Sequence, residues 1–151
     1  MSKYVDRPRY GCAMAGAYYA EVRRMAEMRP TILGHLDIVT KFNGDGAFFD
    51  EEDPRYRAAA LEALHAADPK ETLLEINTGA MSRGYRTAPY PALFLLKEWR
   101  EMGGEIILTA DAHSAGDIVH GYARAAELAR AAGFRRSALL TLAGREERPL
   151  E

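Results

Sequence analysis

The sequence predicts an α/β fold in which strands and helices alternate, and three observations support this prediction. Four apolar runs have the length of strands: 31–35, 73–77, 105–110 and 138–142. The segments between them are longer, and their apolar residues recur at helical spacing. One helix between successive strands is the pattern of parallel strands joined by crossovers. With 151 residues, 48% of them hydrophobic and 28% charged, the chain has the composition of one globular domain, and we assign residues 1–151 to it.

The first half of the chain supplies two helices and two strands. Residues 14–28 place apolar groups at helical spacing, and Pro30 lies just beyond them as a stop before the strand at 31–35. Residues 43–53 are rich in Gly, Asp and Asn and predict a loop. Pro54 suits the first turn of a helix, which we extend to Ala67. The strand 73–77 follows.

The second half repeats the alternation. Two prolines, at 89 and 91, precede a predicted helix at 92–102, which Gly103 and Gly104 end. The strand 105–110 leads into a predicted helix at 115–132, closed by Gly133, and the strand 138–142 comes last.

Charge and composition exclude several classes of function. A net charge of −2 and a pI near 6.1 argue against a broad nucleic-acid surface. Cys12, the single cysteine, provides neither an internal disulfide nor a thiolate-rich zinc site, which suggests a reducing compartment. The chain has no run of about 20 apolar residues, and its first residues are too polar for a signal peptide. We therefore expect a cytoplasmic protein with no membrane or nucleic-acid partner.

Polar side chains follow three of the predicted strands. His35 comes after the first strand, Asn77 ends the second, and Asp111 and His113 follow the third. The side chains of residues i and i+2 of an extended chain point to the same side, so Asp111 and His113 can bind one ligand together. The carboxyl ends of parallel strands meet at one edge, where α/β proteins place their sites. Imidazole and carboxylate at that edge indicate a metal site.

Each of these features also has a purely structural explanation. Asp111 or Ser114 could cap the helix predicted to begin near residue 115, with His113 on the surface. Glu75 could be satisfied by backbone amides, and Asp37 could orient a neighbouring histidine or cap a turn. Spacing alone leaves both readings open.

Three segments in order resemble a known family, the polymerase-and-histidinol-phosphatase (PHP) superfamily. Residues 34–42 (GHLDIVTKF) resemble its segment with a metal-binding histidine. Residues 75–84 (EINTGAMSRG), followed by Tyr90-Pro91, resemble the substrate-side loop of the histidinol-phosphatase branch. Residues 109–113 (TADAH) resemble the last metal motif, with Ala110 where serine is commoner. The likeness covers nearly the whole chain and corresponds to the C-terminal part of a PHP domain.

The resemblance implies half of a distorted (β/α) barrel with a cluster of two or three divalent metals at its rim. The implied protein is a histidinol-phosphatase, a hydrolase that releases phosphate from L-histidinol phosphate in the amino-acid biosynthesis pathway to histidine. The metals would be zinc, manganese or iron, and the ligand types do not choose among them. A metal-activated water would attack the phosphate, with no further catalytic side chain implied.

Carried over residue by residue, the resemblance gives two sets of site residues. The implied metal ligands are His35, Asp111 and His113. The implied contacts to the substrate phosphate are Arg83, Ser82 and Asn77. A guanidinium suits a phosphate because it can donate two parallel hydrogen bonds.

The chain also departs from the family pattern. The family's His-x-His motif has no counterpart, because no histidine precedes His35. We therefore expect an incomplete metal cluster, and an N-terminal half supplied elsewhere or self-association into a homo-oligomer, since about four parallel strands leave unpaired edges. Whether this chain alone is an enzyme stays open. The alternatives are a non-catalytic PHP-fold fragment or interaction module and, less favoured by the acidic balance, a polymerase-type PHP exonuclease.

Overall fold

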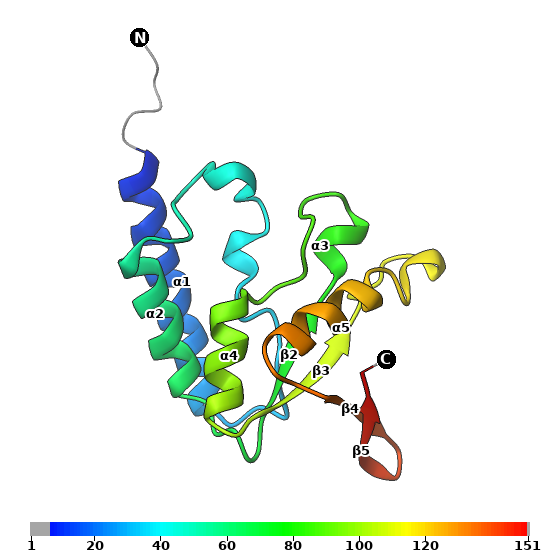
Figure 1. Ribbon diagram of the computed structural model, residues 1–151. Coiled ribbons are helices and arrows are strands. Elements are labelled where there is room, and N and C mark those ends of the chain that lie inside the picture. The colour runs from blue at the N-terminus through cyan, green and yellow to red at the C-terminus, as the bar shows by residue number, and fades with distance from the viewer. Residues whose placement is uncertain (1–6, 151) are drawn as a thin grey trace.

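A computed structural model describes the backbone of residues 7–150 and the side chains of residues 11–150, and it confirms a mixed α/β fold (Figure 1). The helices are α1 (Arg7–Glu27), α2 (Pro54–His65), α3 (Gly79–Ser82), α4 (Leu93–Glu101) and α5 (Tyr122–Ala131). The strands are β1 (Ile32–Leu33), β2 (Leu73–Asn77), β3 (Glu105–Thr109), β4 (Arg136–Thr141) and β5 (Gly144–Pro149). Short 3₁₀ turns occupy Ile38–Thr40, Gly44–Gly46 and Ala115–Asp117.

The five strands form one open sheet in the order β1-β2-β3-β4-β5. The first four run parallel, as predicted, with Leu33 opposite Leu74 and Asn77 opposite Thr109. α2 packs on α1, α4 on α2 and α5 on α4, so the helices follow one another in the order of the strands they connect (Figure 1). The sheet is not closed into a barrel by the residues that the structure describes.

Side chains of β2 alternate between two environments. Leu74 and Ile76 join the main core, which α1, α2, α4 and α5 also line, with the fully buried Trp99 of α4 among its largest members. Leu73 belongs to a smaller apolar cluster on the opposite face, together with Ile32, Ile107 and Ala138. Farther along that face β2 carries Glu75 and Asn77. The face away from the helices is therefore apolar at one end and polar at the carboxyl end of the strands.

Local sequence signals explain where α2 begins and where α4 ends. Asp53 caps α2 by accepting a hydrogen bond from the Arg55 backbone N–H at 2.8 Å, and Pro54 occupies the first turn. Gly103, with φ of +83°, ends α4 in the left-handed conformation that glycine adopts readily. Both boundaries agree with the predicted ranges.

Two predictions about the C-terminal third are wrong. Residues 115–132 do not form one helix, because Gly121 has φ of +75° and α5 begins only at Tyr122. The chain also has a fifth strand, which pairs antiparallel with β4 through a hairpin turn. β5 has the sequence GREERP and lacks the apolar alternation by which a strand is predicted. Its charges and proline suit an edge strand.

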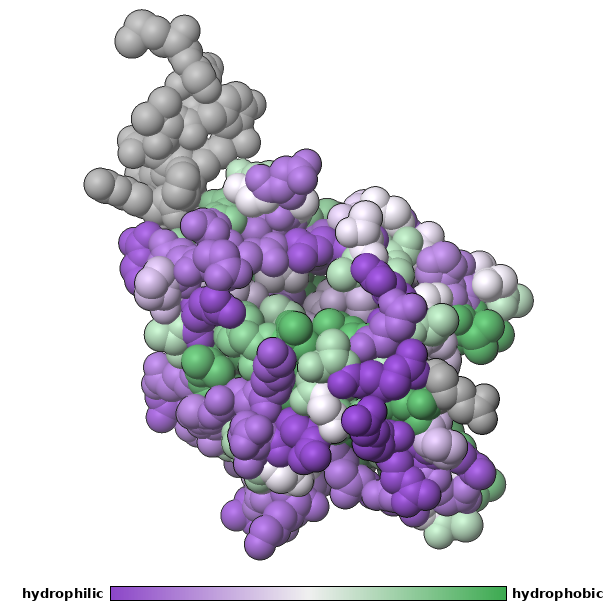
Figure 2. Space-filling view, viewed as in Figure 1, coloured by the Kyte–Doolittle hydropathy of each residue, from purple (hydrophilic) through white to green (hydrophobic). Residues whose placement is uncertain are grey.

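The surface is largely polar, in agreement with the 28% of charged residues in the chain. Charged and polar side chains cover much of the face in Figure 2, with smaller apolar areas between them. None of the helices within residues 7–150 combines enough length with enough hydrophobicity to span a membrane.

Candidate metal and phosphate site

The predicted ligand residues lie together where β1, β2 and β3 end. His35 lies two residues beyond β1, Asp111 lies two residues beyond β3, and Glu75 reaches the same place from β2. His35 Nε2 is 3.9 Å from Glu75 Oε2 and 3.9 Å from Asp111 Oδ2. His113 Nε2 is 3.6 Å from Asp111 Oδ1. We call this group of four side chains the rim cluster.

Two members of the rim cluster have an unusual backbone. His35 has φ of +54° and Asp111 has φ of +46°, in the left-handed region that side chains with a Cβ rarely adopt. Such conformations cost free energy and persist where surrounding contacts impose them, often at functional sites. Here the His35 N–H donates to Glu75 Oε2 at 2.7 Å, and the Asp111 carbonyl accepts from Arg83 Nη1 at 3.0 Å. The rim contacts therefore fix both strained residues.

Glu75 organises the rim to a degree that the sequence did not indicate. Its side chain is nearly buried, and both oxygens accept hydrogen bonds. Oε2 accepts from the His35 N–H, while Oε1 accepts from the Thr109 hydroxyl at 2.6 Å and from Asn77 Nδ2 at 3.2 Å. The carboxylate thus connects β1, β2 and β3 at their carboxyl ends.

The three residues proposed to contact phosphate are placed differently from one another. Arg83 reaches the rim cluster, where its Nη2 donates to Asp111 Oδ2 at 2.8 Å. Asn77 is fully buried; besides its contact with Glu75, its Oδ1 accepts from the Gly79 N–H at 2.8 Å. The Ser82 hydroxyl donates to the Gly79 carbonyl at 3.1 Å. Only Arg83 contacts a rim-cluster side chain that is implied as a metal ligand.

Arg83 also lowers the pKa of Asp111. Partial burial works to raise the pKa of Asp111, but the hydrogen bond and the charge of Arg83, with smaller contributions from the two nearby histidines, hold that pKa below its ordinary value. Asp111 is therefore a carboxylate at neutral pH.

The donor types of the rim cluster fit a divalent metal, because imidazole with carboxylate suits zinc, manganese and iron. Two ligands of one tetrahedral ion, each about 2.1 Å from it, lie about 3.4 Å apart. The rim pairs are within about half an ångström of that spacing. Among residues 11–150, however, no group of three or more His, Cys, Asp or Glu side chains is arranged to hold a metal ion. The rim cluster therefore has the donor types and pair spacings that suit a metal, but not the three-ligand arrangement that would hold one.

Two buried polar atoms at this rim lack a hydrogen-bond partner within the described residues. They are Arg83 Nε and the hydroxyl of Tyr90. Tyr90 is 3% exposed, and its ring lies edge-on to the ring of His35 with 6.3 Å between centroids. Buried donors normally have a hydrogen-bond partner, so two that lack one, both near ligand-type residues, need a physical explanation.

Asp37, close to the rim in sequence, has a separate role. It is fully buried and accepts hydrogen bonds from the hydroxyls of Tyr19 (2.5 Å) and Tyr56 (2.9 Å) and from the Ala92 N–H (3.0 Å). Burial raises the pKa of Asp37 to about 6, although these hydrogen bonds oppose the rise. Its carboxyl group joins α1 and α2 to the start of α4. It neither contacts the His35 side chain nor caps the turn that follows it.

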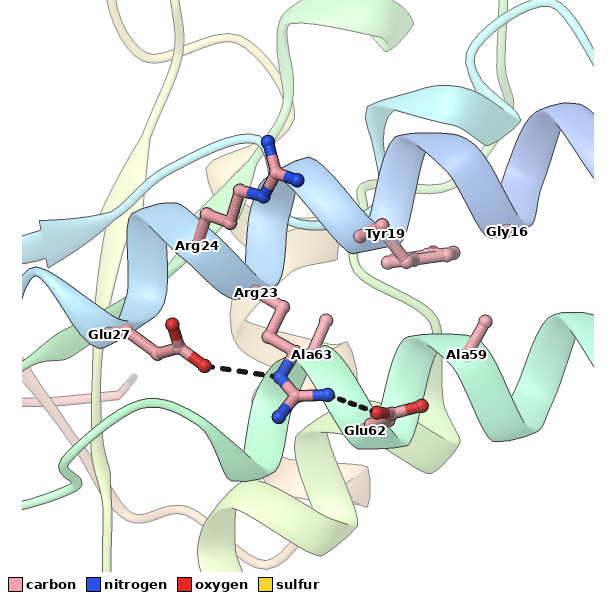
Figure 3. A pocket seen from close by; sticks show the side chains of 9 residues that line it. Gly16, Tyr19, Arg23, Arg24, Glu27, Ala59, Glu62 and Ala63 are labelled. Atoms are coloured by element: carbon pink, nitrogen blue, oxygen red, sulfur yellow. Dashed lines mark hydrogen bonds and ion pairs between the residues drawn. The ribbon is translucent and has the colours of Figure 1, made fainter.

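A surface groove lies away from the rim, between α1 and α2 (Figure 3). It encloses about 350 Å³ and is lined by small residues together with Arg23, which pairs with Glu27 and Glu62. A wider cavity of about 640 Å³ lies between residues 43–51 and 84–88. Neither contains a residue of the rim cluster.

No protein-family model matches the chain, and no curated protein is similar enough to match it. The resemblance to the PHP superfamily therefore stays an expectation from the sequence, and the rim cluster carries the functional proposal.

Proposed function

We propose that this chain contributes the carboxyl-terminal half of a metal-dependent phosphomonoesterase site, resembling that of a cytoplasmic histidinol-phosphatase. The observation that supports it is the meeting of His35, Asp111, His113 and Arg83 at the carboxyl ends of parallel strands. Two of these residues are held in a left-handed backbone conformation. Surfaces without function rarely concentrate strained backbone, ligand-type side chains and a partly buried guanidinium in one place.

In this proposal each residue has a defined task. His35, Asp111 and His113 would hold divalent metal, whose contribution is to activate water and to neutralise charge on the phosphate. Arg83 would release Asp111 to the metal and donate its paired N–H groups to the phosphate of L-histidinol phosphate. Glu75 would keep the His35 backbone in place throughout, because its oxygens already accept three hydrogen bonds.

The finer part of the fold prediction, half of a PHP-type barrel, also belongs to this proposal. Sequential parallel strands joined by helices are the winding that a (β/α) barrel uses, and the polar end of the uncovered face would then look into its interior. β5 covers the outer edge of β4 with charged residues and Pro149. A second copy or another polypeptide would therefore complete the barrel along β1, or displace β5.

A non-catalytic interaction module is the second candidate. Two observations favour it: the Arg83–Asp111 ion pair already neutralises a proposed ligand, and β5 protects one edge of the sheet from pairing. It predicts a folded chain that binds no metal.

The test is phosphate release from L-histidinol phosphate by the purified chain, with and without Mn²⁺ or Zn²⁺, together with metal binding by calorimetry. His113→Gln should abolish metal binding. His65→Gln is the matched control, since His65 is also exposed but pairs with Glu98 on the outside of α2 and α4. Metal-dependent turnover supports the enzyme. Metal binding without phosphate release is the result expected of a half-site. Folded protein that binds no metal refutes the proposal and favours the interaction module.

A further inference from the structure

The face of α1 that points away from the core exposes several apolar side chains. Met14 and Met25 are 49% and 42% exposed, and Met28, which directly follows the helix, is 79% exposed. Ala17 is exposed between them. Residues 14, 17, 21, 24 and 28 are separated by three and four positions in turn, so they form one line along the helix. This is the spacing of a coiled-coil seam, and we call these five residues the α1 stripe.

The two charged residues of the α1 stripe lie at its middle. Glu21 and Arg24 form an ion pair at 3.3 Å, with side chains that are 70% and 76% exposed. An ion pair so exposed contributes little to the stability of one molecule. Arg24 extends away from α2, whereas Arg23 extends toward α2 and pairs with a glutamate there (Figure 3). Glu21 and Arg24 can therefore exchange their mutual contact for contacts with another molecule.

Two copies of the α1 stripe complement each other when the helices lie antiparallel. A two-fold axis at the middle of the stripe places residue 21 opposite residue 24 of the second copy, and residue 17 opposite residue 28. Glu21 then faces Arg24, and the small side chain of Ala17 faces the long one of Met28. In a parallel pair each residue faces its own copy, which sets Glu21 against Glu21 and Arg24 against Arg24. The order of the charges therefore favours the antiparallel arrangement.

We propose that the α1 stripe is a self-association surface, to which a second copy of this chain binds through an antiparallel pair of α1 helices. Two symmetric contacts between Glu21 and Arg24 lie at the centre of this interface, and Met28 packs on Ala17 at either end. The interface uses no residue of the rim cluster and is separate from the edges of the sheet. It does not depend on the proposed function.

The charge balance of α1 favours a protein partner over a lipid surface. Its side chains from residue 11 to residue 27 include two acidic and two basic groups, Glu21, Arg23, Arg24 and Glu27. Helices that bind anionic membranes are instead rich in Lys and Arg. One helix pair with charged residues at its centre is smaller than a standard stable interface of about 1,600 Å². We therefore expect a weak dimer, with a Kd on the order of 10–100 µM.

The test is sedimentation velocity over a range of protein concentrations that spans this Kd. Glu21→Arg and Arg24→Glu each set like charges opposite each other, so each variant alone should associate at least about tenfold more weakly than wild type. An equimolar mixture of the two variants should recover the association of wild type. In the mixed dimer each variant supplies the charge that the other lacks, and both contacts again join opposite charges.

Arg124→Glu is the matched control, because Arg124 forms a similarly exposed ion pair with Glu127, three residues along α5. It should leave the association unchanged. All three variants should keep the circular dichroism spectrum and the melting temperature of wild type, since each replaced side chain is exposed.

Four results would overturn the inference. Wild type that stays monomeric well above the expected Kd shows that the α1 stripe binds no second copy. A dimer that both single variants leave intact lies on another surface, such as an edge of the sheet. Single variants that dissociate but do not associate when mixed rule out the antiparallel register. A monomeric wild type that binds to phosphatidylcholine vesicles assigns the α1 stripe to a lipid surface instead.

Discussion

The fully buried carboxyl of Asp37 should make the stability of this protein fall as the pH rises through weak acidity. Its pKa is about 6 in the folded protein, whereas the ordinary value, which applies to the unfolded chain, is 3.8. The folded state therefore binds the proton more tightly than the unfolded chain does. The stabilisation is complete below pH 3.8 and is lost as the pH rises to about 6. A pKa difference of about 2 corresponds to about 3 kcal/mol. Tyr19, Tyr56 and the Ala92 N–H favour the anion, but burial outweighs them.

Asp37→Asn tests this reasoning, because the amide mimics the neutral carboxyl and does not titrate. The free energy of unfolding is measured in urea from pH 3.5 to 7.5, with the fluorescence of buried Trp99 as the signal. The free energy of unfolding of wild type, minus that of Asp37→Asn, should decrease by about 3 kcal/mol from the lowest to the highest pH. Asp45→Asn, in an exposed loop, should leave the pH profile unchanged. A difference that stays flat would show that the three hydrogen bonds cancel the effect of burial, and one that rises with pH would show that they outweigh it. Either result would refute the reasoning.

Two further substitutions test the packing of the rim and of the core. Glu75→Gln should lower the free energy of unfolding by about 1–3 kcal/mol, because the side-chain nitrogen of glutamine cannot accept a hydrogen bond as the second carboxylate oxygen does. It should also shift the NMR signal of the His35 backbone amide. An unchanged signal would contradict the role given to Glu75. Gly104→Ala should lower the free energy of unfolding by about 2 kcal/mol, because the new Cβ would lie 2.2 Å from Trp99 Cε2. Gly116→Ala is the control, because its Cβ would meet nothing within 4 Å. Thermal melts should show it to be nearly neutral.

The parallel part of the fold was predictable because its signals are local. The strand 73–77 and the helix stops at Gly103 and Gly133 depend on apolar runs and on glycine geometry. β5 was not predictable in this way, since its charged residues pair with β4 through the backbone alone. The late start of α5 depends on a tertiary contact: the Thr78 hydroxyl donates to the His120 carbonyl just before the left-handed Gly121.

The same distinction between local signals and tertiary contacts applies to the candidate site. Ligand-type residues after successive parallel strands must share one edge, so the meeting of His35 with Asp111 follows from strand order and register. The bonding partners do not follow from the sequence. Glu75 is a satisfied structural residue, one of the alternatives that the sequence left open, but its partners could not be named from the sequence. Asp37 does not cap the turn that follows it. Networks that join three elements leave no periodic trace in a sequence.

The rim differs from an ordinary junction between strands and loops because several local rules fail there together. His35 and Asp111 adopt a backbone region suited to glycine, yet each keeps a polar side chain at the strand end. Arg83 contacts Asp111 and Tyr90 contacts His35, and each of these two residues buries a donor that has no acceptor among the described residues. Each departure costs free energy, and a protein that needed only a stable sheet could replace all four with better-adapted residues. Such departures are expected at functional sites, where binding a ligand recovers part of the cost.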